Sequence, residues 1–217
     1  MTPHRVVAID GPAASGKSSV ARELARRLDF AYVNSGAMYR AATWHALEHG
    51  IDLNDAEAVA RLIESAPFVC DLEANQSRIT IGGIDPTNFL RDDRVNDGVS
   101  LVSSVPRVRE ILVKMMRDYV TNHDVVMEGR DIGSVVFPDT PYKFYIDASP
   151  DIRLQRRAAQ GQRDQIAARD RADSSRRASP LIIAEDAHVI DSSNLAIDGV
   201  VGEIIGQLKR KGMGNIE

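Results

Sequence analysis

The sequence predicts an α/β fold: an open parallel sheet with helices on both faces. Short apolar runs such as residues 5–9 and 142–146 are typical of buried strands, and the segments between such runs carry apolar residues at helical spacing. Strands that alternate with helices in this way usually form a parallel sheet. The length of 217 residues is enough for one domain with a full core and small insertions.

Short apolar runs bounded by polar or turn residues predict the strands. Two of these runs, 68–72 and 78–81, are joined by a polar turn at Asn75 and interrupt the alternation of strands and helices. We therefore expect an inserted antiparallel element at about 65–90. In chain order the predicted strands are 5–9, 30–33, 68–72, 78–81, 124–127, 142–146 and 189–190.

Helical spacing of apolar residues, together with start and stop signals, predicts the helices. Asn54 is the predicted N-cap of a helix at 55–65, and Pro106 is the predicted start of another. The heavily charged stretch from Asp151 to about Arg171 is predicted to be helical throughout. In chain order the predicted helices are about 20–28, 35–50, 55–65, a segment that begins near 92, a helix from 106, 151–171 and 195–209.

The segment Gly11–Ser18, GPAASGKS, fits the phosphate-binding loop pattern G-x-x-x-x-G-K-[ST] and predicts a P-loop NTPase fold. A predicted strand precedes it and a predicted helix follows it, as the pattern requires. Backbone N–H groups of such a loop cradle phosphates, Lys17 reaches the β- and γ-phosphates, and the Ser18 hydroxyl ligates Mg²⁺. The alternative is a glycine- and serine-rich turn with an incidental lysine. The predicted triphosphate-binding residues are Gly11, Pro12, Ala13, Ala14, Ser15, Gly16, Lys17, Ser18 and Ser19.

Composition limits the partners and the location of the protein. The net charge of −4 does not support binding to nucleic acid or to anionic membranes, and no stretch approaches the ~20 apolar residues of a membrane helix. The single cysteine, Cys70, excludes an internal disulfide and fits a reducing cytoplasm. His45 and His49 are spaced to chelate a metal, but an exposed helix face is the favoured interpretation. We expect a cytoplasmic protein without a nucleic-acid or membrane partner.

Arginines are concentrated where a transferred phosphoryl group would need positive charge. Arg40 follows the second predicted strand, Arg130 follows the strand at 124–127, and a dense cluster lies between 163 and 177. For that cluster the alternative is a solvated charged helix. Phosphoryl transfer needs several cations around three charged oxygens, and an arginine-rich lid could exclude water from the reaction. The arginines therefore favour a phosphotransferase.

The sequence shows no H-R-D-x-x-x-x-N catalytic loop and no obvious base for a hydroxyl acceptor. A phosphate acceptor needs no base, because its oxygens are already ionised near neutral pH. This favours a nucleoside monophosphate kinase. Two alternatives stay open: another small-molecule P-loop kinase, acting on UMP, AMP or shikimate, and a nucleotide-binding switch domain without turnover.

Six segments, spread over nearly the whole chain and in the family's order, make the chain resemble a bacterial cytidylate kinase. The resemblance implies ATP-dependent phosphorylation of CMP, and of dCMP, by a monomer with Mg²⁺ as cofactor. The chain departs from the family pattern at two places. Glu128 stands where the family usually has aspartate, so the reach of this carboxylate differs. Ala172 and Ser174 make the predicted lid poorer in arginine. The matching segments are 9–18, 35–40, Ser100 with 106–109, 129–138, 169–176 and 179–181.

The same resemblance implies roles by position. It divides the chain into a core (about 1–64, 92–155 and 185–217), a monophosphate-binding insert (about 65–91) and an arginine-rich helical lid (about 156–184). Ser18 would help to hold Mg²⁺ with water and the nucleotide phosphates. The implied catalytic residues are Lys17, Arg40, Arg130 and Arg176. The implied CMP-binding residues are Ser35, Tyr39, Arg40, Ser100, Arg109, Arg130, Asp131, Arg169 and Asp173.

Asp131 gives the implied base preference a physical basis. A carboxylate can accept a hydrogen bond from the amino group of cytosine, whereas the carbonyl oxygen of uracil would repel it. Arg109 can donate to the ring nitrogen and carbonyl of cytosine. The alternative is that Asp131 only pairs with a neighbouring arginine.

Overall fold

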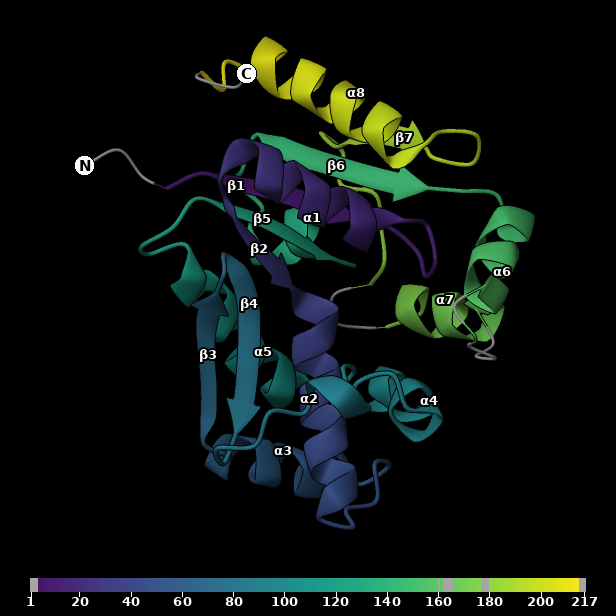
Figure 1. Ribbon diagram of the computed structural model, residues 1–217. Helices are drawn as coiled ribbons and strands as arrows, with labels where there is room; N and C mark the ends of the chain where they lie inside the picture. The colour runs from purple at the N-terminus through teal and green to yellow at the C-terminus, as the bar shows by residue number, and fades with distance from the viewer. Residues whose placement is uncertain (1–3, 160, 162–165, 177–179, 215–217) are drawn as a thin grey trace.

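A central sheet organises the protein. The computed structural model describes residues 4–159, 161, 166–176 and 180–214, apart from the side chains of 166, 167 and 169. Within these residues a seven-stranded sheet has the order β3-β4-β2-β5-β1-β6-β7 (Figure 1). The neighbours β2, β5, β1, β6 and β7 are parallel, which confirms the predicted open parallel sheet. The strands are β1 Val6–Asp10, β2 Ala31–Asn34, β3 Phe68–Glu73, β4 Gln76–Ile81, β5 Val125–Gly129, β6 Tyr142–Asp147 and β7 His188–Asp191.

Helices cover both faces of the sheet, as predicted, because side chains alternate along each strand. Val125 and Met127 of β5 pack on the side of α2 to α5, whereas Val126 between them packs on the side of α1 and α8. Helices α6 and α7 lie apart from these two layers, at one end of the parallel strands (Figure 1). The α-helices are α1 Lys17–Leu28, α2 Ser35–Glu48, α3 Ala56–Ser65, α4 Asp93–Val102, α5 Pro106–Tyr119, α6 Pro150–Ala159, α7 Ile166–Ser174 and α8 Ile197–Arg210.

The pairing of β1 with β5 brings the two most informative sequence motifs together. Ile9 is in register with Glu128 and Asp10 with Gly129, so both strands end at the same level. The phosphate-binding loop leaves the end of β1, and the Glu128–Asp131 segment leaves the end of β5. Open parallel sheets bind ligands at this carboxyl edge.

The predicted antiparallel element is present as the β3–β4 hairpin. Its turn residues Ala74 and Asn75 both have positive φ, the backbone that a tight two-residue hairpin turn requires. However, the hairpin is not separate from the main sheet, because β4 lies beside β2 and Tyr32 donates a backbone hydrogen bond to Asn75. The sheet therefore continues into the predicted insert.

Two local predictions were wrong. The N-cap of α3 is Asp55, not Asn54: the Asp55 carboxylate accepts a hydrogen bond from the backbone N–H of Ala58 at 2.9 Å, whereas Asn54 bonds to Asp52. The charged stretch predicted as one helix from 151 to about 171 forms two helices, α6 and α7. Gly161 lies between them with φ of 69°, a left-handed conformation that ends a helix readily.

Two short helical elements were not predicted. A 3₁₀ turn spans Thr87–Phe89, and a π-helical turn spans Ile132–Val136. The π turn depends on a residue more than a hundred positions away, because Asp10 accepts hydrogen bonds from the backbone N–H groups of Ile132 and Gly133. Local sequence patterns carry no signal for such a contact. None of the described helices is both long and apolar enough to cross a membrane.

We predict that Leu112→Ala in α5 lowers the free energy of unfolding by about 2–5 kcal/mol, because Leu112 is fully buried against the sheet and its loss leaves a cavity. Urea denaturation followed by circular dichroism measures the change. Leu101→Ala is the matched control: that side chain on α4 is 42% exposed, and its loss should cost less than about 1 kcal/mol. Equal losses in the two variants would contradict this assignment of the core.

Candidate active site

The loop between β1 and α1 has the backbone of an anion site. Gly11 must be glycine, because a Cβ there would collide with the carbonyl oxygen of Ile146 on β6. Gly16, at φ of 90°, is the N-cap of α1 and supplies no side-chain hydrogen bond to the first N–H groups of the helix. A helix N-terminus without a side-chain cap suits a bound phosphate. Lys17, buried at the start of α1, donates from Nζ to the carbonyl oxygen of Pro12 at 3.0 Å.

Asp10 connects the loop to the β5 side of the site. Its two carboxylate oxygens accept hydrogen bonds from the backbone N–H groups of Ile132 and Gly133, each at 2.8 Å. Burial raises the pKa of the Asp10 carboxyl to about 7, although these two hydrogen bonds act in the opposite direction. Asp10 therefore holds the π turn against the end of β1.

A cluster of buried polar side chains lies at the ends of β2 and β5, beside α2 and α5. Arg109 and Asp131 form an ion pair in which both side chains are only 6% exposed. The Arg109 guanidinium also lies over the Tyr39 ring, with its Cζ 5.3 Å from the ring centroid. Burial raises the pKa of Tyr39 to about 12, so this phenol stays neutral. Ser35 donates to the Glu128 carbonyl oxygen at 2.8 Å, and Gly129 leaves the room for this approach.

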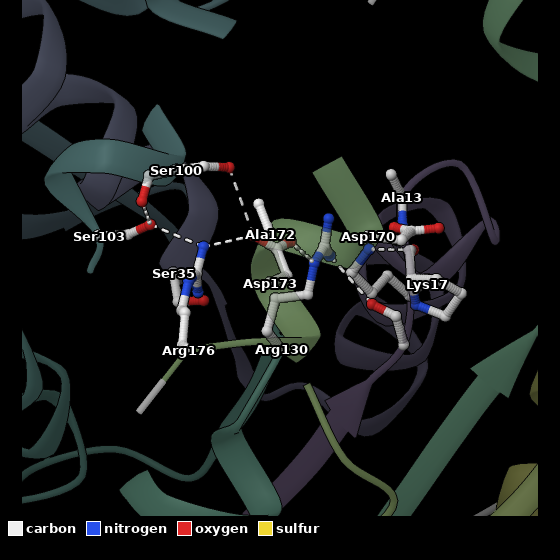
Figure 2. A network of polar contacts seen from close by, with 12 residues as sticks. Ala13, Lys17, Ser35, Ser100, Ser103, Arg130, Asp170, Ala172, Asp173 and Arg176 are labelled. Carbon is white, nitrogen blue, oxygen red and sulfur yellow. Dashed lines mark hydrogen bonds and ion pairs between the residues drawn. The ribbon is translucent and has the colours of Figure 1, made fainter. Parts of the chain in front are cut away.

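Helix α7 places Asp173 between Arg130, which follows β5, and Arg176, which follows α7 (Figure 2). Arg130 donates from Nε to Asp173 at 2.8 Å and from Nη1 to the Gly11 carbonyl oxygen at 3.0 Å. Arg176 pairs with the other Asp173 oxygen and donates to the Ser103 hydroxyl at 2.8 Å. Desolvation lowers the pKa of Arg176, which indicates how deeply this cation is buried. The structure thus brings the predicted residues Arg130, Asp173 and Arg176 together.

The remaining predicted residues lie at different distances from this network. Ser100 donates weakly to Asp173 at 3.4 Å, and Arg40 contacts Asn96 of α4 at the same distance. Ser19 is exposed and lines a separate cavity of about 670 Å³ between α1, the β3–β4 turn and the start of α8. The side chain of Arg169 falls outside the described residues.

Sequence reasoning missed two arginines of α6 that contact the phosphate-binding loop. Arg153 donates to the Ala13 carbonyl oxygen at 3.3 Å, and Arg156 donates to the Ser15 carbonyl oxygen at 3.1 Å. Arg156 also donates to the Ser192 carbonyl oxygen at 2.7 Å, which connects the loop to the end of β7. Their spacing of three residues places both side chains on one face of α6, but the same spacing recurs along charged helices, so the sequence carried no signal that distinguished these two arginines.

The side chains near the loop fit a Mg²⁺ ion that is held mainly by nucleotide phosphates. Ser18 lies half-buried in the first turn of α1, and Glu128 lies buried at the end of β5, where its Oε1 accepts from the Tyr32 hydroxyl at 3.2 Å. Hydroxyl and carboxylate oxygens are the ligands that Mg²⁺ prefers, and it commonly keeps several waters. Among the described residues no cluster of three His, Cys, Asp or Glu side chains could hold a metal by itself.

Comparison with known proteins gives concordant matches over nearly the whole chain. The sequence pattern of the cytidylate kinase family matches residues 7–210. A cytidylate kinase of Rhodococcus jostii is 44% identical over 216 residues, which cover 94% of each chain. Those of Pelotomaculum thermopropionicum and Clostridium botulinum are 43% and 40% identical, and cover 93% and 94% of this chain and 95% and 97% of their own.

The chain also shares its fold with a solved kinase structure. A gluconokinase structure from Sinorhizobium meliloti superposes with a TM-score of 0.50 over 97% of this chain and 94% of its own. At 13% sequence identity this likeness concerns the fold alone, and it agrees with the predicted P-loop architecture.

The raised pKa of Asp10 predicts an unusual pH dependence of stability. Between about pH 4 and 7 the folded protein keeps this proton while the unfolded chain releases it, so the contribution of Asp10 to the free energy of unfolding falls as the pH rises. The difference in unfolding free energy between wild type and Asp10→Asn should show this fall, measured by urea denaturation from pH 4.5 to 8 without divalent cations. Parallel curves for the two proteins would contradict the shift.

Proposed function

We propose how ATP and CMP are bound at this site. The proposal starts from one premise: this chain belongs to the cytidylate kinase family. The protein is a kinase that transfers the γ-phosphoryl group of ATP to CMP, giving CDP and ADP. We propose that dCMP is a second acceptor of the phosphoryl group. The observation that carries the assignment of residues is the position of Arg130 and Arg176, between the phosphate-binding loop and the buried Arg109–Asp131 pair.

The donor half is the loop from Gly11 to Ser19 with the start of α1. Its N–H groups hold the phosphates of ATP, and Lys17 neutralises the charge at the β- and γ-phosphates. The Ser18 hydroxyl, with Glu128 acting through water, would help to hold Mg²⁺ against the phosphates. When bound, the ion would supply further neutralisation of the triphosphate. Arg153 and Arg156 support the loop from α6, because they donate to its carbonyl oxygens.

The acceptor half holds CMP with residues of α2, α4 and α5 and with Asp131, which follows β5. Asp131 accepts from the amino group of cytosine, Arg109 donates to its ring nitrogen and carbonyl, and Tyr39, Ser35 and Ser100 line the pocket. Because Arg109 and Asp131 are buried and paired, a base that cannot match their hydrogen bonds leaves charged groups unsatisfied. The pairing of Asp131 with Arg109 is compatible with base recognition, because a carboxylate has a second oxygen that can accept from the amino group of cytosine.

Phosphoryl transfer in this arrangement needs positioning and positive charge but no general base. Arg40 and Arg130 hold the acceptor phosphate, Arg176 neutralises the transferring group, and Asp173, with Arg169, reaches the ribose. Each cation contributes most where water is excluded. We assign the lid, about 156–184, to that exclusion and the insert, about 65–91, to the acceptor side. We also propose that the protein works as a monomer in the cytoplasm.

A panel of acceptors tests the activity. We expect ADP formation from ATP with CMP and dCMP at rates far above those with UMP, AMP or shikimate, because the buried Arg109–Asp131 pair matches cytosine. A coupled assay of ADP release measures kcat/KM for each acceptor. Preference for AMP would contradict the cytidine assignment, and ATP binding without turnover on any acceptor would favour a switch domain.

The role of Asp131 makes a separate prediction. Asp131→Asn should lower the ratio of kcat/KM for CMP over UMP by at least ~10-fold, because the new amide can donate to the uracil carbonyl that a carboxylate repels. The side chain keeps its shape, so the pocket keeps its volume. Asp118→Asn is the control, since that carboxylate is 62% exposed on α5. A ratio unchanged by Asp131→Asn would place base recognition elsewhere.

A further inference from the structure

We propose that Asp170 of α7 is a further residue that determines the affinity for the donor nucleotide, because its carboxylate competes with the triphosphate for the phosphate-binding loop. The proposal rests on the proposed function, in which this loop binds ATP. Figure 2 shows Asp170 beside Ala13, close to the side of the site that Lys17 occupies.

The contacts of Asp170 match those that a phosphate makes in such a loop. One carboxylate oxygen accepts a hydrogen bond from the backbone N–H of Ala13 at 3.1 Å. The other oxygen pairs with the guanidinium of Arg153, which also donates to the Ala13 carbonyl oxygen at 3.3 Å. A loop amide and a guanidinium around a shared anion form the usual receptor for a phosphate group.

The contact of Asp170 with Arg153 and Ala13 is largely buried, and it excludes a second acceptor at the Ala13 N–H. The side chains of Asp170 and Arg153 are 16% and 13% exposed, so their interaction is only partly screened by water. An amide N–H has one hydrogen atom, so Ala13 cannot give full hydrogen bonds to both Asp170 and a phosphate oxygen. The negative charges of Asp170 and the triphosphate also repel one another. ATP binding therefore requires that Asp170 leave Ala13.

Arg153 can pair with a phosphate oxygen once Asp170 has left. Its Nε is buried and makes no hydrogen bond within the described residues, so the guanidinium has a donor to spare. When Asp170 leaves, Arg153 loses its counter-charge, and a phosphate oxygen replaces it. Asp170 thus lowers the affinity for ATP and, once the triphosphate departs, satisfies the loop again.

A structural role for Asp170 makes the opposite prediction. If the carboxylate only holds α7 in place, its removal loosens the lid and ATP binds less tightly or equally well. If the carboxylate competes with ATP, its removal tightens binding. The sign of the change therefore separates the two roles.

The test is the equilibrium binding of ATP, without an acceptor, by isothermal titration calorimetry. Asp170→Asn should bind ATP about 5- to 10-fold more tightly than wild type, since a charge-assisted contact no longer has to be displaced. In steady state at saturating CMP, the KM for ATP should fall by a similar factor while kcat does not rise. Asp151→Asn is the matched control: it removes a carboxylate from the exposed surface of α6 and should leave ATP affinity unchanged.

Asp170→Ala, which removes both carboxylate oxygens, is the second variant, and thermal denaturation checks that each variant is folded. Unchanged or weaker ATP binding by a folded Asp170 variant overturns the proposal. Failure of the proposed function would look different, because wild type and variants alike would then not bind ATP. Tighter binding in both variants, with Asp151→Asn unchanged, supports competition.

Discussion

The need to neutralise buried guanidinium groups governs the arrangement of this site. Arg109, Arg130 and Arg176 converge where β2 and β5 end, and a cation out of water is costly without a carboxylate partner. Asp131 pairs with Arg109 from the end of β5, and Asp173 pairs with the other two from α7. Because Asp173 lies on α7 and Arg130 follows β5, the docking of α7 and the charge balance at the end of β5 depend on each other.

The same constraint connects structure to chemistry. The arginines need negative charge, and the substrates of a kinase carry it on their phosphates. One protein carboxylate, Asp170, already accepts from the backbone N–H of Ala13 in the phosphate-binding loop. In our proposal, ATP binding replaces this carboxylate by a phosphate oxygen at Ala13 and Arg153.

Much of the fold and part of the site follow from local sequence. The Gly11–Ser18 loop is contiguous, so its pattern, its flanking strand and its helix are visible together. The N-cap at Asp55 and the helix end near Gly161 were missed, because several neighbouring residues could have served in each place. The π turn at Ile132–Val136 could not be predicted from local sequence, because its backbone is held by Asp10 from another strand. Arg153 on a charged helix had no local mark that distinguished it from solvated neighbours.

The sequence by itself determined the fold class, the phosphate-binding loop and the kinase family, because contiguous residues and their periodicity carry each of them. Only the tertiary structure decided which carboxylate meets which arginine. Arg109 and Asp131 are 22 residues apart, and Arg130 and Asp173 are 43 apart. Such pairs depend on the register of β1 with β5 and on how α7 docks against the core. Many arginine–aspartate pairings are equally consistent with the sequence, and the cost of burying an unpaired charge selects among them in three dimensions.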